Sequence, residues 1–155
     1  MPKRRNQIEM TPEEQDAFLR EGHTLQVASI GPRGYPHLVA MWYALVDGKV
    51  CFTTYAKSQK VLNLRRNPKI SVMLETGRPY NELRGLVVEG EAEIVDDDPE
   101  LAAKVMMISG SRRPGEPPAG PPTPQTLRAV AKRVVVRVNP VYVYSWDHRK
   151  LGGAD

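Results

Sequence analysis

Hydrophobic and polar residues alternate with a period of two through most of the chain, which is the pattern of half-buried β-strands. Asp47-Gly48 lies between two of these segments and is a strong hairpin signal, because both central positions of such a turn need positive φ. With few helices between the strands, the pattern predicts a mainly β fold, a closed antiparallel barrel with peripheral helices. The predicted strands cover residues 24–30, 35–45, 49–54, 69–75, 86–95 and 133–146.

Helix signals occur at four places around these strands. Thr11-Pro12-Glu13-Glu14 offers an N-cap, a proline at the first helical position and a glutamate that completes a capping box. Three more short helices are predicted where Ser58, Asp98 and Thr123 can cap a first turn. They cover about 59–66, 98–108 and 123–131.

The remaining segments are poor in residues that could build a core. Residues 109–124 are rich in proline and glycine and predict a mobile surface loop, while residues 1–10 predict a flexible tail. A chain of 155 residues can bury one sizeable core, so we expect residues 1–155 to form a single domain.

The segment from Thr53 to Pro68 joins the end of a strand to a short helix that the proline stops. Between residues 57 and 72 there is no acidic residue, and Lys57 and Lys60 stand where the helix begins. The backbone donors and the dipole of a helix N-terminus attract anions. Two interpretations fit this segment: a pocket for a phosphate group, and a solvated basic helix without a ligand.

Composition narrows the classes of partner and site. The net charge of +4 favours anionic partners without choosing among them. Cys51 is the only cysteine, which excludes an internal disulfide framework and suits a reducing cytoplasm. The three histidines are scattered, so we expect no metal site. No apolar run has the length of a membrane span and the first residues do not read as a signal peptide, so we expect a cytoplasmic protein.

The positive net charge also raises the possibility that the protein binds nucleic acid. The aromatic cluster Met41-Trp42-Tyr43 precedes the basic turn and does not interleave with it, and no recognition motif is present. We therefore expect no nucleic-acid partner. The same cluster could line a flat aromatic cofactor or fill a core, and the pattern leaves both possibilities open.

Taken together, these segments resemble the pyridoxamine 5′-phosphate oxidase-like split-barrel flavoproteins, and within them the actinobacterial flavin or deazaflavin (coenzyme F420) oxidoreductases. The resemblance covers nearly the whole chain except the proline-rich loop. Its motifs are the capped helix 11–20, Gly34-Tyr35-Pro36-His37 leading to Met41-Trp42-Tyr43, Thr53-Thr54 followed by Lys57-Ser58-x-Lys60-x-x-Asn63, then Asn67-Pro68, and the strand 86–92.

The resemblance implies a homodimer of six-stranded split barrels with two flavin-type cofactors at the subunit interface. It implies no catalytic side chain, because the cofactor itself carries the hydride. The second subunit would contribute Arg84 and Trp146. In the first subunit, the residues implied to bind the phosphate of the cofactor are Thr54, Lys57, Ser58 and Lys60, with Asn63 in the same motif. Those implied to line its ring are Met41, Trp42 and Tyr43, with Thr53 at the edge of the ring.

The choice of cofactor depends on the surplus of basic residues. F420 carries a polyglutamate tail besides its phosphate, whereas FMN needs only the phosphate pocket. We therefore expect F420, with FMN as the alternative, and hydride transfer to a small planar or unsaturated acceptor. Two alternatives stay open: an FMN-dependent enzyme similar to pyridoxamine-phosphate oxidase, and a non-catalytic flavin or haem binder. The residues expected to hold the tail are Arg65, Arg66, Lys69, Arg112 and Arg113.

Overall fold

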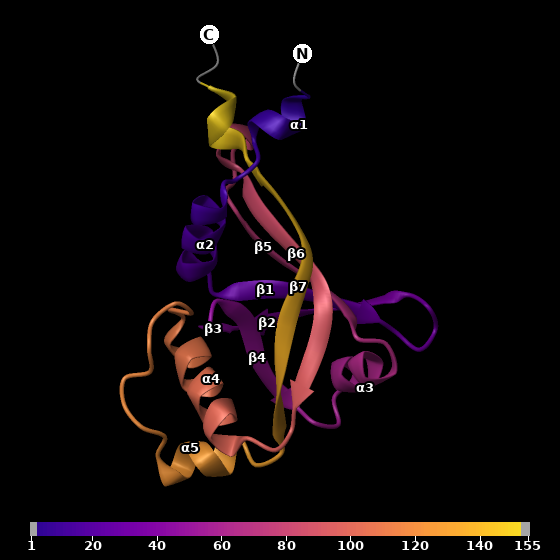
Figure 1. The fold of residues 1–155 in the computed structure, drawn as a ribbon, viewed down its shortest axis with the longest axis vertical. Coiled ribbons are helices and arrows are strands. Elements are labelled where there is room, and N and C mark those ends of the chain that lie inside the picture. Colours follow the sequence, from indigo (N-terminus) through magenta and orange to yellow (C-terminus); the bar gives the residue numbers. More distant parts are fainter. Residues whose placement is uncertain (1–2, 153–155) are drawn as a thin grey trace.

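Seven antiparallel strands form one curled sheet with helices at its flanks in the computed structural model, which describes residues 3–152 (Figure 1). The order across the sheet is β2-β1-β5-β6-β7-β4-β3. The strands are β1 (Thr24–Ile30), β2 (Pro36–Trp42), β3 (Ala44–Val46), β4 (Lys49–Tyr55), β5 (Lys69–Thr76), β6 (Arg84–Val95) and β7 (Arg133–Asp147). The helices are α1 (Arg4–Gln7), α2 (Pro12–Glu21), α3 (Gln59–Arg66), α4 (Pro99–Ser111), α5 (Pro124–Ala129), η1 (Tyr80–Glu82) and η2 (His148–Leu151).

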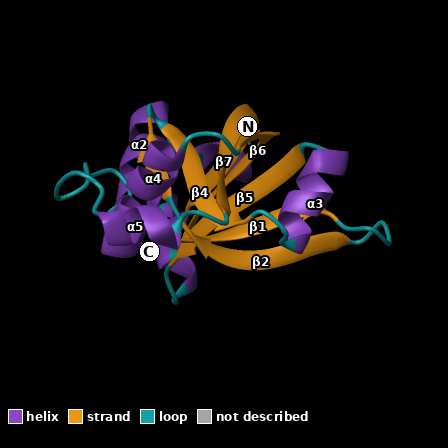
Figure 2. Cartoon of the chain, turned by 90° about the horizontal axis from the view of Figure 1, so that it is seen from below, coloured by secondary structure: helices purple, strands orange, loops and turns teal. Residues whose placement is uncertain are grey.

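The sheet is curled because its first and last strands are joined by one residue. β2 and β3 occupy opposite ends of the strand order, yet only Tyr43 separates Trp42 from Ala44. Two residues of extended chain span at most about 7 Å, so the two edges of the sheet must meet at Tyr43. This confirms the predicted mainly β, barrel-like fold with peripheral helices, here as a half-barrel whose edges converge at one corner. Figure 2 shows the strands curving around the interior.

The predicted strand 35–45 is therefore two strands. Its first part pairs with β1 and its last part pairs with β4, which lies on the other edge of the sheet. Alternation alone could not reveal this break, because the apolar run continues through Tyr43. The remaining predicted strands are confirmed, with β6 beginning two residues earlier than expected and β4, β5 and β7 each ending one residue later.

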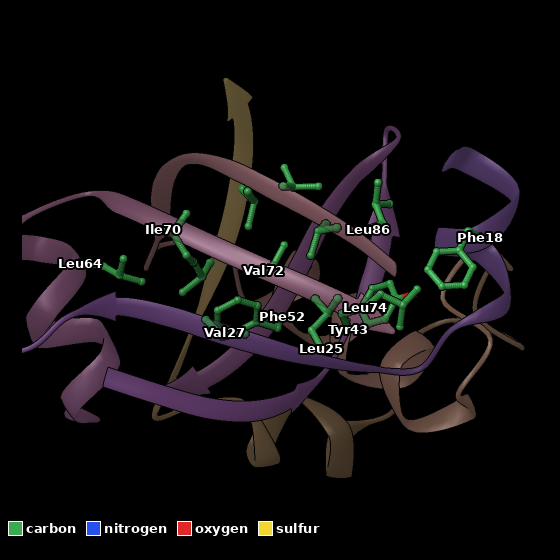
Figure 3. Close-up of a cluster of buried hydrophobic side chains, with 14 of the residues drawn as sticks. Phe18, Leu25, Val27, Tyr43, Phe52, Leu64, Ile70, Val72, Leu74 and Leu86 are labelled. Carbon is green, nitrogen blue, oxygen red and sulfur yellow. The ribbon is translucent and has the colours of Figure 1, made fainter. Parts of the chain in front are cut away.

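The main core lies on the concave face of the sheet. One row of directly paired residues crosses five neighbouring strands and consists entirely of valine: Val39, Val27, Val72, Val88 and Val143. β-Branched side chains pack well on a pleated surface, and the residues on either side of this row point away from the interior. Phe52, Leu25 and Leu86 pack around it, and Phe18 of α2 closes one end (Figure 3).

A second, smaller core lies under α4. Asp98 caps this helix, because its Oδ1 accepts from the backbone N–H of Leu101 at 3.0 Å. Ala103 and Val105 of the helix pack onto the β3–β4 hairpin. Figure 2 shows α4 and α5 beside β4, while α3 lies across β1 at the other side of the sheet. The two groups of helices therefore pack on different parts of the sheet, α4 on the β3–β4 hairpin and α3 on β1 and β6.

The segments before α2 and after α4 are fixed at several points. Residues 1–2 of the expected tail lie outside the described residues, whereas the backbone N–H of Met10 donates to Ser145 Oγ at 2.9 Å. Helix α4 extends to Ser111, into the segment expected to be a loop. Beyond it, the carbonyl of Pro114 accepts from the backbone N–H of Leu45 at 2.8 Å. The proline-rich segment therefore begins with an anchored turn.

Candidate functional site

A cluster of cationic and hydroxyl groups forms where β4 leads into α3. Lys60 Nζ donates to Thr54 Oγ1 at 2.8 Å, and Thr54 Oγ1 lies 3.3 Å from Ser58 Oγ. Ser58 occupies the N-cap position of α3, but its hydroxyl caps no backbone N–H, unlike the hydrogen bond that we predicted. The first-turn N–H groups of α3 therefore donate no hydrogen bond to the Ser58 side chain, and they lie beside this cluster.

The charge of Lys60 is poorly compensated. Partial burial and then the nearby positive charge of Arg133 lower the pKa of Lys60 below its ordinary value. Among residues 3–152, no carboxylate lies within 4 Å of Lys60. An ammonium group that is partly desolvated and has a cation as its neighbour gains stability when an anion approaches. The cluster is therefore electrostatically suited to an anion.

Arg133 is a site residue that the sequence analysis missed. It begins β7 and pairs with Tyr55 of β4, which places its guanidinium 4.3 Å from the centre of the Tyr55 ring. Its NH1 also points towards the carbonyl of Thr53 at 3.5 Å. Nothing in the sequence near residue 133 shows that β7 pairs with β4 across about 80 residues, so only the fold could reveal this neighbour.

Asn63 has a different place from the one its motif implies. Its side chain is fully buried, donates from Nδ2 to Ser29 Oγ at 3.1 Å and accepts at Oδ1 from Gln59 Nε2 at 2.8 Å. Arg66 extends past it and donates to the carbonyl of Ile30 at 2.8 Å. Asn63 and Arg66 thus fasten α3 to the end of β1. This attachment fixes the helix that carries Lys60.

An open hollow of about 410 Å³ lies on the other face of β4. Thr53 and Thr54 are consecutive strand residues, so they point to opposite faces, and Thr53 lines this hollow while Thr54 belongs to the lysine cluster. Arg133 lines the hollow and also influences Lys60, so it connects the two places. The lining residues, none of them acidic in the described chain, are Ala40, Met41, Trp42, Thr53, Met106, Ser109, Gly110 and Arg133.

Two of the three predicted ring residues line the hollow, and the third does not. Trp42 is 46% exposed and Met41 is half-buried. Tyr43 is fully buried at the corner of the sheet, where its hydroxyl donates to the carbonyl of Leu19. Burial raises the pKa of Tyr43, which keeps its hydroxyl neutral. Tyr43 therefore joins α2 to the corner and offers no surface to a ligand in this chain.

Arg84 and Trp146 lie far from the lysine cluster within one chain. Arg84 pairs with Asp147 at one end of the β6–β7 ladder, and Thr54 pairs with Val134 near the other end. At about 3.3 Å per residue, the thirteen residues from Val134 to Asp147 extend roughly 40 Å along a straight strand. A single chain does not bring these groups together.

The basic residues expected to hold an acidic tail are only partly available. Arg65 lies 3.4 Å from Asp96 Oδ2, and Arg113 lies 3.7 Å from Glu116 Oε2. Lys69 is exposed, as is Lys57, which was predicted to bind the phosphate and not the tail. Arg112 stacks on Trp42, with its guanidinium carbon 4.3 Å from the ring centroid. Arg112 therefore lies at the hollow and not beside α3.

The described residues contain neither a metal-binding cluster nor a membrane-spanning helix. Within residues 3–152, no three His, Cys, Asp or Glu side chains gather closely enough to hold a metal ion. No helix in this part of the chain combines the length and apolar character needed to span a bilayer. The candidate site consists of the lysine cluster, Arg133 and the hollow.

Comparisons with known proteins agree with this architecture. A family model described as pyridoxamine 5′-phosphate oxidase matches residues 11–147. A conserved hypothetical protein, Rv2991 from Mycobacterium tuberculosis, is 43% identical with a TM-score of 0.86, and the match covers 99% of this chain and 95% of that one. A solved F420 reductase is 28% identical with a TM-score of 0.63, covering 86% of this chain and 98% of that one.

A more distant structure shows the fold alone. The haem storage protein HutZ from Vibrio cholerae is 18% identical with a TM-score of 0.62, and the match covers 85% of this chain and 92% of that one. No curated protein matched the sequence. The family model spans both halves of the sheet and the whole lysine cluster, which confirms the resemblance read from the motifs. The chain belongs to the pyridoxamine 5′-phosphate oxidase-like split-barrel family.

Proposed function

We propose that this protein is an oxidoreductase that uses coenzyme F420 to transfer hydride to a small planar or unsaturated acceptor. The bound deazaflavin would supply the hydride chemistry. The chain would bind the phosphate of the cofactor, orient its ring and exclude water. The chain's similarity to a solved F420 reductase, at 28% identity, favours this cofactor.

The observation that carries the proposal is the chemistry of the lysine cluster. At the start of α3, the Thr54 hydroxyl lies 2.8 Å from the Lys60 ammonium group and 3.3 Å from the Ser58 hydroxyl. These are donors that phosphate oxygens accept from, and the helix N-terminus adds backbone donors. Lys60, Thr54 and Ser58 would hold the phosphate, with Lys57 at the rim and Arg133 on the side of the hollow.

The hollow supports the proposed position of the ring. Met41 and Trp42 line it, and Thr53 places a backbone carbonyl and a hydroxyl at its edge. Thr53 at the hollow and Thr54 in the lysine cluster are consecutive residues of β4. A ligand with its phosphate in the lysine cluster can therefore reach the hollow past the edge of this strand. Flat aromatic ligands pack well on exposed aromatic and methionine side chains.

The register of the sheet supports the proposed contribution of a second subunit. A row of directly paired residues on the convex face runs from Ala40 of β2 to Tyr144 of β7. Trp42 and Trp146 each lie two residues beyond this row in the same direction. Since side chains alternate along a strand, both indole rings belong to the convex face, four strands apart. Two copies packed through this face in a twofold arrangement could bring Trp146 of one to Trp42 of the other. Arg84 lies with Leu86 on the opposite face, where its guanidinium is 5.1 Å from the centre of the Phe18 ring, so this packing does not account for the expected role of Arg84.

Exposed apolar side chains lie on both outer strands of the convex face. Leu38 of β2 is 66% exposed and Tyr142 of β7 is 58% exposed, and the row of paired residues between them also holds Ser71 and Glu89. Exposed apolar side chains beside polar ones are typical of surfaces that meet a partner. A homodimer through this face would bury them and complete the cofactor site.

Cofactor titration tests the proposal directly. F420 and FMN are titrated into the purified protein, with fluorescence as the readout and light scattering as a measure of oligomeric state. We expect F420 to bind a dimer and Lys60→Ala to weaken that binding roughly ten- to hundredfold, because a charged hydrogen bond is lost. Lys49→Ala is the charge-matched control, because this lysine donates to Asn139 Oδ1 at 2.8 Å and belongs to no part of the proposed site.

Each alternative outcome has a clear meaning. Binding of FMN alone would reject the deazaflavin assignment, and unaltered affinity in Lys60→Ala would reject the phosphate pocket. Oxidation of the reduced cofactor is monitored by its absorbance in the presence of a panel of quinones and conjugated enones. Tight F420 binding with no such oxidation would favour a cofactor carrier over an enzyme.

A further inference from the structure

We infer that the acceptor carries a carboxylate or similar anionic group, which Arg112 recognises at the Trp42 end of the hollow. This inference rests on the proposed function, because it assigns the acceptor side of the same site. It concerns a residue at the end of α4 that the phosphate pocket does not use.

The first support is the order of the cations along the site. Lys60 lies in the phosphate cluster, Arg133 lies between that cluster and the hollow, and Arg112 lies at the far end against Trp42. A cofactor with its phosphate at Lys60 has its ring towards Trp42 and its tail beyond the phosphate. Arg112 is therefore at the ring end, where the acceptor must lie and where the tail does not reach.

The second support is that Arg112 has no charged partner. Its neighbour Arg113 pairs with Glu116, but no carboxylate in residues 3–152 lies within 4 Å of Arg112 or Arg133. Each of the two unpaired guanidinium groups instead stacks on an exposed aromatic ring, at 4.3 Å. A stacked guanidinium keeps its in-plane N–H groups directed outward, where a carboxylate can accept two of them.

The third support is that the backbone holds Arg112 in place. It ends α4 in the left-handed conformation (φ 60°), and its N–H donates to the carbonyl of Ser109 at 3.1 Å. Two residues later, the carbonyl of Pro114 is bound by the N–H of Leu45 at 2.8 Å, and Arg20 NH1 donates to the carbonyl of Gly115 at 3.1 Å. Anchored on both sides, the guanidinium is a positioned charge that costs little entropy to use.

The experiment compares two probes of the same shape, one with an anionic carboxylate and one with a neutral amide. We titrate 2-naphthoate and 2-naphthamide by calorimetry into the F420-saturated protein and into the free protein. The variants are Arg112→Ala, Arg112→Lys and Arg113→Ala, the last being the adjacent arginine that pairs with Glu116. We expect the unaltered protein to prefer naphthoate by about tenfold or more, since hydrogen bonds to charged groups are the strong ones.

The expected pattern across the variants is specific. Arg112→Ala should lose most of the preference, Arg112→Lys should keep part of it, and Arg113→Ala should keep all of it. Equal affinity for the two probes in the unaltered protein, or an unchanged preference in Arg112→Ala, would overturn the inference. F420 affinity measured on the same variants separates the two proposals: absent F420 binding rejects the proposed function, whereas a naphthoate preference in the free protein would still support the role of Arg112.

Discussion

Replacing Asn63 by leucine should destabilise the protein chiefly by breaking its buried hydrogen bond with Ser29; the bond from Gln59, which is also lost, comes from an exposed side chain that water can satisfy. Asn63 and Ser29 are 0% and 2% exposed, and they are joined by the 3.1 Å bond from Nδ2 to Oγ. Leucine has a similar volume but leaves the Ser29 hydroxyl buried without its donor. The lost bond costs about 1 kcal/mol and the unsatisfied hydroxyl about 1–3 kcal/mol, while the apolar side chain regains part of this. We expect a net loss of about 2 kcal/mol in the free energy of unfolding.

The same change should also loosen the lysine cluster. An eight-residue helix such as α3 is unstable by itself and depends on its tertiary attachments. Val61 and Leu64 keep their apolar contacts in the variant, so the helix should remain but lose its fixed position. F420 affinity should therefore fall even though Asn63 is too deeply buried to contact a ligand.

A double-mutant cycle measures the pair. Chemical denaturation of Asn63→Leu, Ser29→Ala and the double variant should give an interaction energy of about 1 kcal/mol, because the double variant leaves no orphaned hydroxyl. Thermal melting should drop by about 4–8 °C in Asn63→Leu. Leu62→Ala, at a half-exposed position of the same helix, is the control and should change little. Additive single effects, or an undiminished melting temperature, would refute the reasoning.

Three further changes test other parts of the structure. Inorganic phosphate keeps a constant charge above about pH 8, so calorimetric titration in that range reports on the protein alone. The affinity of the protein for phosphate should fall as the pH rises through the lowered pKa of Lys60, because the ammonium group loses its charge. Lys60→Arg should abolish that fall. Gly85→Ala should cost about 1–3 kcal/mol in denaturation experiments, because its Cβ would overlap the Trp146 ring; no loss would contradict the stacking. Hydrogen bonds from Arg149 lower the pKa of Asp147 in the folded state. The ionised Asp147 therefore adds to the free energy of unfolding at pH values above its unfolded-state pKa, and this stabilisation is lost as the pH falls through its folded-state pKa. The denaturation midpoint of Asp147→Asn should thus lie below that of the unaltered protein at neutral pH and converge with it in acid; parallel curves would refute this.

The fold was readable from sequence where one local signal decides the structure. The capping box at Thr11 is present, with Oγ1 accepting from Glu14 N at 3.2 Å, and the Asp47-Gly48 hairpin has positive φ at both positions. The break at Tyr43 was not readable, since it reflects which strands pair and not which residues alternate. Pairing between strands distant in the chain leaves no local pattern.

The candidate site was readable only in part for the same reason. The lysine cluster is formed by residues close together in sequence, so the motif located Thr54, Ser58 and Lys60 together. Arg133 enters through the β4–β7 pairing, and no spacing rule could have brought it in. Asn63 illustrates the opposite error, because a motif position says that a residue matters without saying whether it faces a ligand or the core.

The position of β7 in the sheet has a consequence for synthesis on the ribosome. β7 is the last strand to be made, yet it separates β6 from β4 in the strand order. Until it emerges, the β3–β4 hairpin has no other strand to pair with, and isolated hairpins are marginal in water. Nascent chains should therefore expose the aromatic and valine side chains of the unfinished barrel for most of translation. We expect ribosome-bound intermediates lacking residues 133–147 to be protease-sensitive and to need chaperone protection.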